Sequence, residues 1–187
     1  MEFLSMLWMP ILVSAVIIWL ASAIMHMALP FHKGEYKGLP DEAKFNAALE
    51  GVAPGFYMFP WCGSMANMKD PDYLAKVEKG PNGFMSIVSG GVNFGKNLML
   101  MLLYYLLVGT FVAYVGWYAM GRGGDYLHVF RVTGAAAFLA YGLGHLPRTI
   151  WYRDPGFWAY LFDGIVYALL TAGVFAWLWP RAMAVAV

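Results

Sequence analysis

The residues of this chain that could do chemistry inside a membrane are few. His26 and His145 each lie near the end of a long apolar run, Arg148 follows His145 closely, and Asp163 lies within another apolar run. An ionisable side chain in a membrane-spanning helix is costly, so it faces the interior of the bundle or a wet cavity. These four residues are therefore the candidates for a polar functional cluster.

Two kinds of function follow from such a cluster. His26 and His145, on different helices, could be the axial ligands of a haem, or each could bind a chlorophyll-type pigment, which gives an electron-transfer subunit. Asp163 with a histidine and Arg148 nearby could relay protons or bind a small anion, which gives a small transporter or channel centred on Asp163. Haem or pigment is the cofactor that the sequence leaves open.

A metal site and an enzyme find less support. Zinc would need a third ligand, which His32 could supply, but Pro30 intervenes and the spacing matches no known motif, so no metal site is predicted. No nucleophile, base and orienting group occur in a recognisable pattern, so neither catalytic residues nor an enzyme are predicted. The structural alternative is that Asp163 pairs with Arg148 or Arg153 while the histidines lie at the membrane interface.

Four apolar runs could hold these residues in a membrane. At a rise of ~1.5 Å per residue, about 20 residues cross a ~30 Å hydrocarbon core. The chain is 61% hydrophobic and only 12% charged, against roughly 25% charge in soluble domains. The sequence predicts an all-α integral membrane protein with four transmembrane helices, over approximately residues 3–29, 97–120, 127–147 and 155–180.

The third run is the weakest, because it spans only if Arg131 snorkels to the interface. Its Gly134–Ala137 segment suits close helix approach. Trp and Tyr gather in two groups, and such belts mark the two membrane surfaces. The groups fit four crossings: Trp8, Trp117, Tyr118, Tyr126, Trp177 and Trp179 at one surface, and Tyr36, Trp61, Trp151, Tyr152 and Trp158 at the other.

The order of the spans places the candidate residues together. Spans one and three run in the same direction, so His26 and His145 lie in the same leaflet. Span four starts from that side, which puts Asp163 roughly 10 Å inside it. We expect His26, His145, Arg148 and Asp163 to meet beneath the loop that joins the first two spans.

That loop, residues 33–96, is about 64 residues long and holds every lysine of the chain but no arginine. Two short helices are predicted in it. One covers about residues 41–50, and the other is capped by Asp70, opens on Pro71 and ends at Gly80. The apolar run 56–61 is too short to span, so we expect it in the membrane interface or against a partner. The loop is thus the expected lid or partner surface.

Basic residues near the helix ends give an orientation. The face with residues 33–96 and 148–156 has nine lysines and arginines, and the opposite face has three. The positive-inside rule places the first face, with the loop, in the cytoplasm and both termini outside. A single cysteine, Cys62, excludes an internal disulfide.

Nucleic acid and nucleotide are not expected ligands. The net charge is only +1, and the basic residues do not form a nucleic-acid footprint. The segment 90–96 matches the start of a phosphate-binding P-loop, but Asn97 replaces the Ser or Thr that contacts Mg²⁺, and no buried strand precedes it.

Six stretches of the chain look familiar: Met27–Pro30, Leu39–Glu42, Pro54–Pro60, Gly80–Gly83, Asp163–Tyr167 and Trp177–Pro180. Together they resemble a family of small four-span bacterial inner-membrane proteins without assigned function. The resemblance implies a bacterial inner-membrane protein with a structured loop after its first span, and it brings no activity. The chain is rich in aromatic residues and methionine, it has small-residue helix faces, and it lacks a reaction pattern. These features favour a non-catalytic accessory or scaffolding subunit of a membrane complex of the respiratory or photosynthetic type. Such a subunit would contact lipid and other integral subunits.

Overall fold

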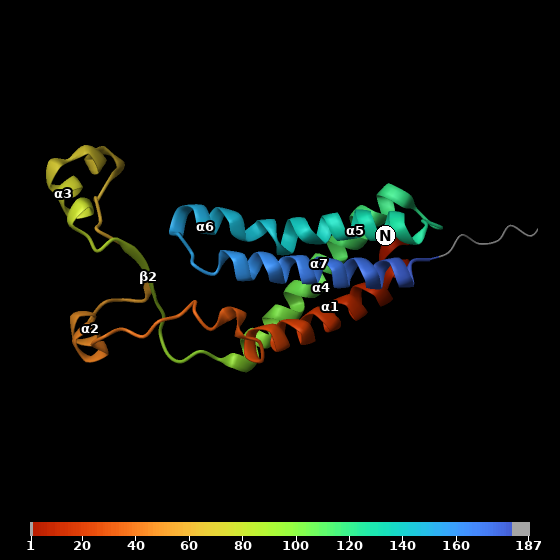
Figure 1. Cartoon of the computed structure of the whole chain (residues 1–187), viewed down its shortest axis with the longest axis horizontal. Helices are drawn as coiled ribbons and strands as arrows, with labels where there is room; N and C mark the ends of the chain where they lie inside the picture. Colours follow the sequence, from red (N-terminus) through yellow and green to blue (C-terminus); the bar gives the residue numbers. More distant parts are fainter. Residues whose placement is uncertain (1, 181–187) are drawn as a thin grey trace, which may run out of the picture. The chain divides into compact units, whose positions relative to one another are not determined.

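Four long helices dominate the computed structural model, which describes residues 2–180 (Figure 1). Each of the four spans is long and apolar enough to cross a membrane. The prediction of a four-helix membrane protein is therefore confirmed. The long helices are α1 (Glu2–Met27), α4 (Phe94–Met120), α5 (Tyr126–Tyr141) and α7 (Phe157–Leu178).

The third span is longer than the sequence predicted. After α5 the chain makes a 3₁₀ turn, η3 (Leu143–His145), and continues as α6 (Leu146–Tyr152), so that the whole span runs from Tyr126 to Tyr152. Pro147 lies in the first turn of α6, where the missing N–H costs no helical hydrogen bond. The glycines and the proline near residue 145 therefore coincide with a change from α-helix to a 3₁₀ turn that does not end the span.

The four spans pack as a ring of neighbours. α1 contacts α4 and α7, and α5 contacts α4 and α7. The core holds fully buried side chains from all four spans, among them Ile18, Tyr105, Val129 and Phe175. A Cβ added to Gly134 would lie 3.1 Å from the Cβ of Ala172, so α5 and α7 approach closely at the small-residue segment, as the sequence predicted.

Side-chain donors tie the helix ends together. The indole N–H of Trp19 donates to the carbonyl of Leu98 (3.0 Å), which links α1 to the start of α4. At the other end the indole N–H of Trp179 donates to the carbonyl of Gly121 (3.1 Å). The second bond supplies a partner for a carbonyl at the C-terminal end of α4, where no helical N–H follows to satisfy it.

Residues 37–92 form a separate compact unit. Both predicted loop helices are present: Asp41 caps the first by accepting from the Lys44 N–H, and Asp70 caps the second by accepting from the Asp72 N–H. Gly80, at a positive φ of 64°, ends the second. The elements of this unit are α2 (Glu42–Ala48), β1 (Gly55–Phe59), η2 (Met65–Lys69), α3 (Pro71–Lys79) and β2 (Gly83–Ile87).

The unit also contains a sheet that the sequence did not predict. β1 and β2 pair antiparallel, with Gly55 opposite Ile87 and Phe59 opposite Gly83. The apolar run that we expected at an interface thus supplies one strand. Its partner strand begins more than 20 residues later, too far for the short turn that marks a hairpin in a sequence.

Candidate metal centre

His26 lies in the last turn of α1. Its Nδ1–H donates to the carbonyl oxygen of Ser22, one turn earlier (3.0 Å). That bond places a proton on Nδ1, so in the neutral ring the lone pair is on Nε2. Nε2 lies 3.7 Å from Oδ2 of Asp163, and the His26 side chain is 42% exposed.

A proline-initiated turn brings His32 to the same place. Pro30 opens η1 (Pro30–His32), where its fixed φ suits a 3₁₀ turn. The turn folds the chain back, and the His32 ring stacks on His26 with centroids 4.0 Å apart and an interplanar angle of 12°. His32 is buried, and its Nε2 lies 3.0 Å from Oδ2 of Asp163.

Asp163 lies in the second turn of α7, and its side chain is only 4% exposed. One carboxylate oxygen, Oδ2, faces both histidines, whereas Oδ1 is buried without a hydrogen-bond partner among the described residues. The neighbouring Gly164 sets the depth of this carboxylate: a Cβ there would lie 2.4 Å from the Cα of Gly142. Only glycine lets α7 touch the end of α5 so closely.

Glu35 and Tyr160 surround His32. Oε1 of Glu35 lies 2.6 Å from Nδ1 of His32, and Oε2 accepts a hydrogen bond from the Tyr160 hydroxyl (3.1 Å). The Glu35 side chain is 10% exposed. His32 thus has a carboxylate on each ring nitrogen, and the outer carboxylate is itself held in place.

Three tyrosines border the site on the membrane side. Tyr167 follows Asp163 by one helical turn, and its ring meets those of Tyr105 and Tyr141 edge to face, with centroids 5.9–6.1 Å apart. All three are buried. These rings keep the hydrocarbon-side environment of Asp163 poor in water, which strengthens electrostatic interactions at the carboxylate.

The cluster has an excess of acceptors over protons. When Nδ1–H of each histidine donates to its outer partner, the two Nε2 lone pairs and the Asp163 carboxylate face one another. Asp163 is buried and the Glu35 side chain is only 10% exposed, and among residues 2–180 these two carboxylates pair with histidines and with no lysine or arginine. Carboxylates so little exposed to water need a positive charge beside them, which either protons on the histidines or a metal ion would supply.

The ligand atoms are close enough for one ion. One nitrogen each from His26 and His32 and one oxygen from Asp163 all lie within 4.8 Å of one another. An ion lies in the plane of each imidazole that binds it, whereas the two rings are nearly parallel. Ligation therefore requires the rings to tilt apart, and the half-exposed His26 has room to do so.

Two of the residues expected in the cluster lie elsewhere. Arg148 donates to Asp154 (3.0 Å) and is largely exposed. The backbone N–H of Gly156, and then the Arg148 guanidinium, hold the pKa of Asp154 below its usual value. Arg148, near the end of the third span, is thus paired with Asp154 in the connection to α7 and not with Asp163.

His145 stacks on the ring of Tyr160, with centroids 4.9 Å apart and an angle of 12°. It borders the cluster without contacting Asp163 through a ring nitrogen. The structure therefore brings His26 together with Asp163, as the sequence predicted, and replaces His145 and Arg148 with His32 and Glu35.

From the sequence alone, His32 is only a possible third zinc ligand, and Glu35 and Tyr160 are not expected in the cluster. His32 and Glu35 are three residues apart, and His26 precedes His32 by six residues. The sequence presents Pro30 as a break between the histidines, whereas in the structure Pro30 starts the turn that stacks them. Nothing in the sequence marks Tyr160, three residues before Asp163, because its role depends on how α7 meets the residues after α1.

Comparison with known proteins gives no relative. No family model matches the chain, and neither a curated protein nor a solved structure is similar to it. Function must therefore be argued from the site.

Proposed function

We propose that this chain is an integral membrane protein that binds one divalent transition-metal ion through His26, His32 and Asp163. One observation supports this most strongly. Both histidines have Nδ1 bonded to an outer acceptor, and both direct Nε2 at the same carboxylate oxygen.

This pattern is typical of metal-binding histidines. They usually donate the second ring N–H to a carboxylate or a backbone carbonyl, which fixes the tautomer and makes the ligating nitrogen more basic. Glu35 supplies the carboxylate for His32, and Ser22 supplies the carbonyl for His26. A divalent ion would also neutralise the two negative charges of Asp163 and Glu35.

The donor set favours a borderline ion. Two imidazole nitrogens and one carboxylate oxygen suit Zn²⁺, Fe²⁺ or Co²⁺, whereas Mg²⁺ and Ca²⁺ prefer oxygen alone. Three protein ligands leave at least one position open, as in zinc sites that hold water or a substrate. The ion therefore has room for an exogenous ligand at the end of the helix bundle.

The other functions suggested by the sequence have less support in this geometry. Haem ligation by His26 and His145 needs both rings free, but His145 stacks on Tyr160 and Nε2 of His26 faces Asp163. A proton relay or transporter centred on Asp163 would use the same histidines. In that function the histidines would bind protons in place of a metal ion.

Zinc titration of the full-length protein in detergent, after removal of metal with a chelator, tests the proposal. We expect one high-affinity zinc ion per chain in the wild type and its loss in Asp163→Asn, which keeps the shape but removes the charge. The control is His128→Gln, which changes an exposed histidine in the first turn of α5. This variant should bind zinc normally. Equal affinity in wild type and Asp163→Asn would rule out the site.

A second proposal concerns a partner. We infer that the protein is an accessory subunit of a larger bacterial membrane complex and that residues 37–92 are its contact surface. All of these residues are described, and none is buried. Large apolar side chains there, including Trp61, Met65 and Val92, are more than two-thirds exposed. Exposed large apolar side chains on a unit without a buried core favour a surface that a partner covers.

Trp61→Ser and Met65→Ser test this proposal. We expect the wild type, extracted in a mild detergent from its native membrane, to run as a complex well above the mass of one chain. The two substitutions should release the chain from that complex. A lone chain in the wild type would contradict the proposal.

The remaining proposal is the location of this surface. We propose that the protein is in the bacterial inner membrane with residues 37–92 in the cytoplasm, as the distribution of lysines and arginines favours. Cys62 is the only cysteine and is partly exposed, so it reports the side directly. A membrane-impermeant maleimide should label Cys62 in inverted vesicles and leave it unlabelled in intact spheroplasts. The reverse pattern would place the unit outside.

A further inference from the structure

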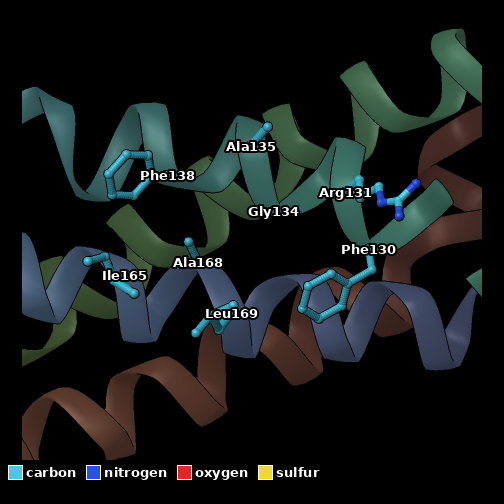
Figure 2. Close-up of a pocket in the computed structure, with 8 residues that line it drawn as sticks. All are labelled: Phe130, Arg131, Gly134, Ala135, Phe138, Ile165, Ala168 and Leu169. Carbon is cyan, nitrogen blue, oxygen red and sulfur yellow. The ribbon is translucent and has the colours of Figure 1, made fainter. Parts of the chain in front are cut away.

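An apolar groove of about 370 Å³ lies between α5 and α7 (Figure 2). Small residues of both helices, Gly134, Ala135 and Ala168, leave space between the rings of Phe130 and Phe138. Part of the lining is exposed, so the groove opens to the surroundings of the helix pair. Because both helices are membrane spans, those surroundings are lipid.

Arg131 is the charged residue of this lining and lies at one end of the groove (Figure 2). Its side chain is exposed and forms no ion pair with any acidic residue among residues 2–180. Asp125, the nearest acid in sequence, instead accepts from the His128 N–H and caps α5.

The depth of Arg131 makes this isolation costly. It follows Tyr126 by five residues, about 7.5 Å along the helix at ~1.5 Å per residue, so its Cα lies inside the span. A guanidinium without a counter-ion at such a depth is unfavourable, and its long stem lets it reach back toward the headgroups. No acidic residue between positions 2 and 180 pairs with Arg131, so we look to a ligand for the anion.

The groove and the arginine together define that ligand. It needs an anionic group at the Arg131 end and a slender apolar chain that follows the groove past Phe138, about 10 Å further along α5. Phosphate oxygens match the planar guanidinium, which binds them through two parallel hydrogen bonds. We propose that this groove binds an acyl chain of an anionic phospholipid whose phosphate pairs with Arg131.

A net negative lipid fits better than a zwitterionic one. In phosphatidylcholine the headgroup carries its own cation, which competes with Arg131 for the phosphate. In phosphatidylglycerol the arginine has no such competitor. The site shares no residue with the His26, His32 and Asp163 cluster, so it stands or falls independently of the metal.

Lipid retention measures the proposed preference. The full-length protein is incorporated into nanodiscs containing equal amounts of phosphatidylglycerol and phosphatidylcholine, and the lipid retained on release is measured by native mass spectrometry. We expect the wild type to retain phosphatidylglycerol in preference to phosphatidylcholine. In Arg131→Gln the ratio of the two retained lipids should fall about tenfold, which is the effect of losing one charge-assisted hydrogen-bond pair. Arg122→Gln is the control, because it removes a cation that pairs with Glu2 near the same end of the bundle. This variant should keep the full preference for phosphatidylglycerol.

A substitution that fills the groove tests the contribution of the groove to lipid binding separately from that of Arg131. Ala135→Leu should reduce retention of both lipids, provided that gel filtration shows an unchanged folded protein. Retention that is insensitive to Arg131→Gln or to Ala135→Leu would overturn the proposal.

A photo-crosslinking amino acid at position 135 identifies the occupant in native membranes. We expect an adduct with the mass of a phospholipid. An adduct with a second copy of the chain or with another protein would show that the groove is a protein interface, and the lipid proposal would be wrong.

Discussion

Asp163 is the residue on which the account depends, because both histidines face its Oδ2 atom (3.0 Å from His32 and 3.7 Å from His26). A carboxylate this deeply buried needs a compensating cation. His32 is the more constrained of its two partners, since it is buried and bonded on both ring nitrogens.

His32→Gln is therefore expected to weaken zinc binding by more than about a hundredfold, because it removes a ligand and not merely an outer support. The matched control is His145→Gln, which removes a histidine that stacks on Tyr160 in the same region. Competition with a chromophoric chelator measures both affinities. If the two variants lost zinc affinity equally, His145 would have to be a ligand as well as His32.

Glu35 gives a milder prediction. It does not face Asp163 but holds Nδ1 of His32 at 2.6 Å. Glu35→Gln keeps an acceptor and removes the charge, so zinc affinity should fall by about 10–100-fold while the stoichiometry stays at one ion per chain. Loss of the ion altogether would make Glu35 a direct ligand, and an unchanged affinity would remove it from the site.

Among the elements, the contact between α7 and the end of α5 sets the geometry of the site. Gly164 touches the backbone of Gly142, and any side chain there must push the two segments apart. Because Asp163 is the adjacent residue, the displacement moves the carboxylate away from the histidines.

Gly164→Ala should therefore lower the stability of the folded protein by about 1–3 kcal/mol, as overpacking does, and weaken zinc binding as well. Gly173→Ala is the control on the same helix, since an added Cβ there meets no atom within 4 Å. Thermal unfolding in detergent and the zinc titration give the two readouts. A Gly164→Ala variant as stable as Gly173→Ala would mean that the helices do not approach as described.

The elements also show how far the sequence leads. Uncharged runs of 20 or more residues and local caps such as Asp41 and Asp70 predict helices, because hydrophobic length and capping are local properties. The sheet of β1 and β2 and the η1 turn were missed, because each depends on a contact formed only after folding. The same holds for the site: His26 and Asp163 could be paired by counting helix directions, whereas His32 required the turn at Pro30.

For the whole molecule, the proposed metal site and the proposed contact surface belong to different units. The three proposed ligands and Glu35 lie in the unit that includes residues 2–36 and 93–180, whereas the proposed contact surface lies in residues 37–92. Trp61→Ser should release the chain from its partner complex and leave zinc affinity unchanged. Co-purification and zinc titration of the same preparation check this, and a joint loss would show that the ion requires the partner.

X-ray absorption at the zinc edge of the zinc-loaded, full-length protein shows whether His26 and His32 bind the ion. We expect a first shell of nitrogen and oxygen at about 2.0–2.2 Å, with the outer-shell scattering of two imidazoles, and the loss of one imidazole in His32→Gln. A zinc shell without imidazole scattering, or one that is the same in wild type and His32→Gln, would contradict binding by these two residues.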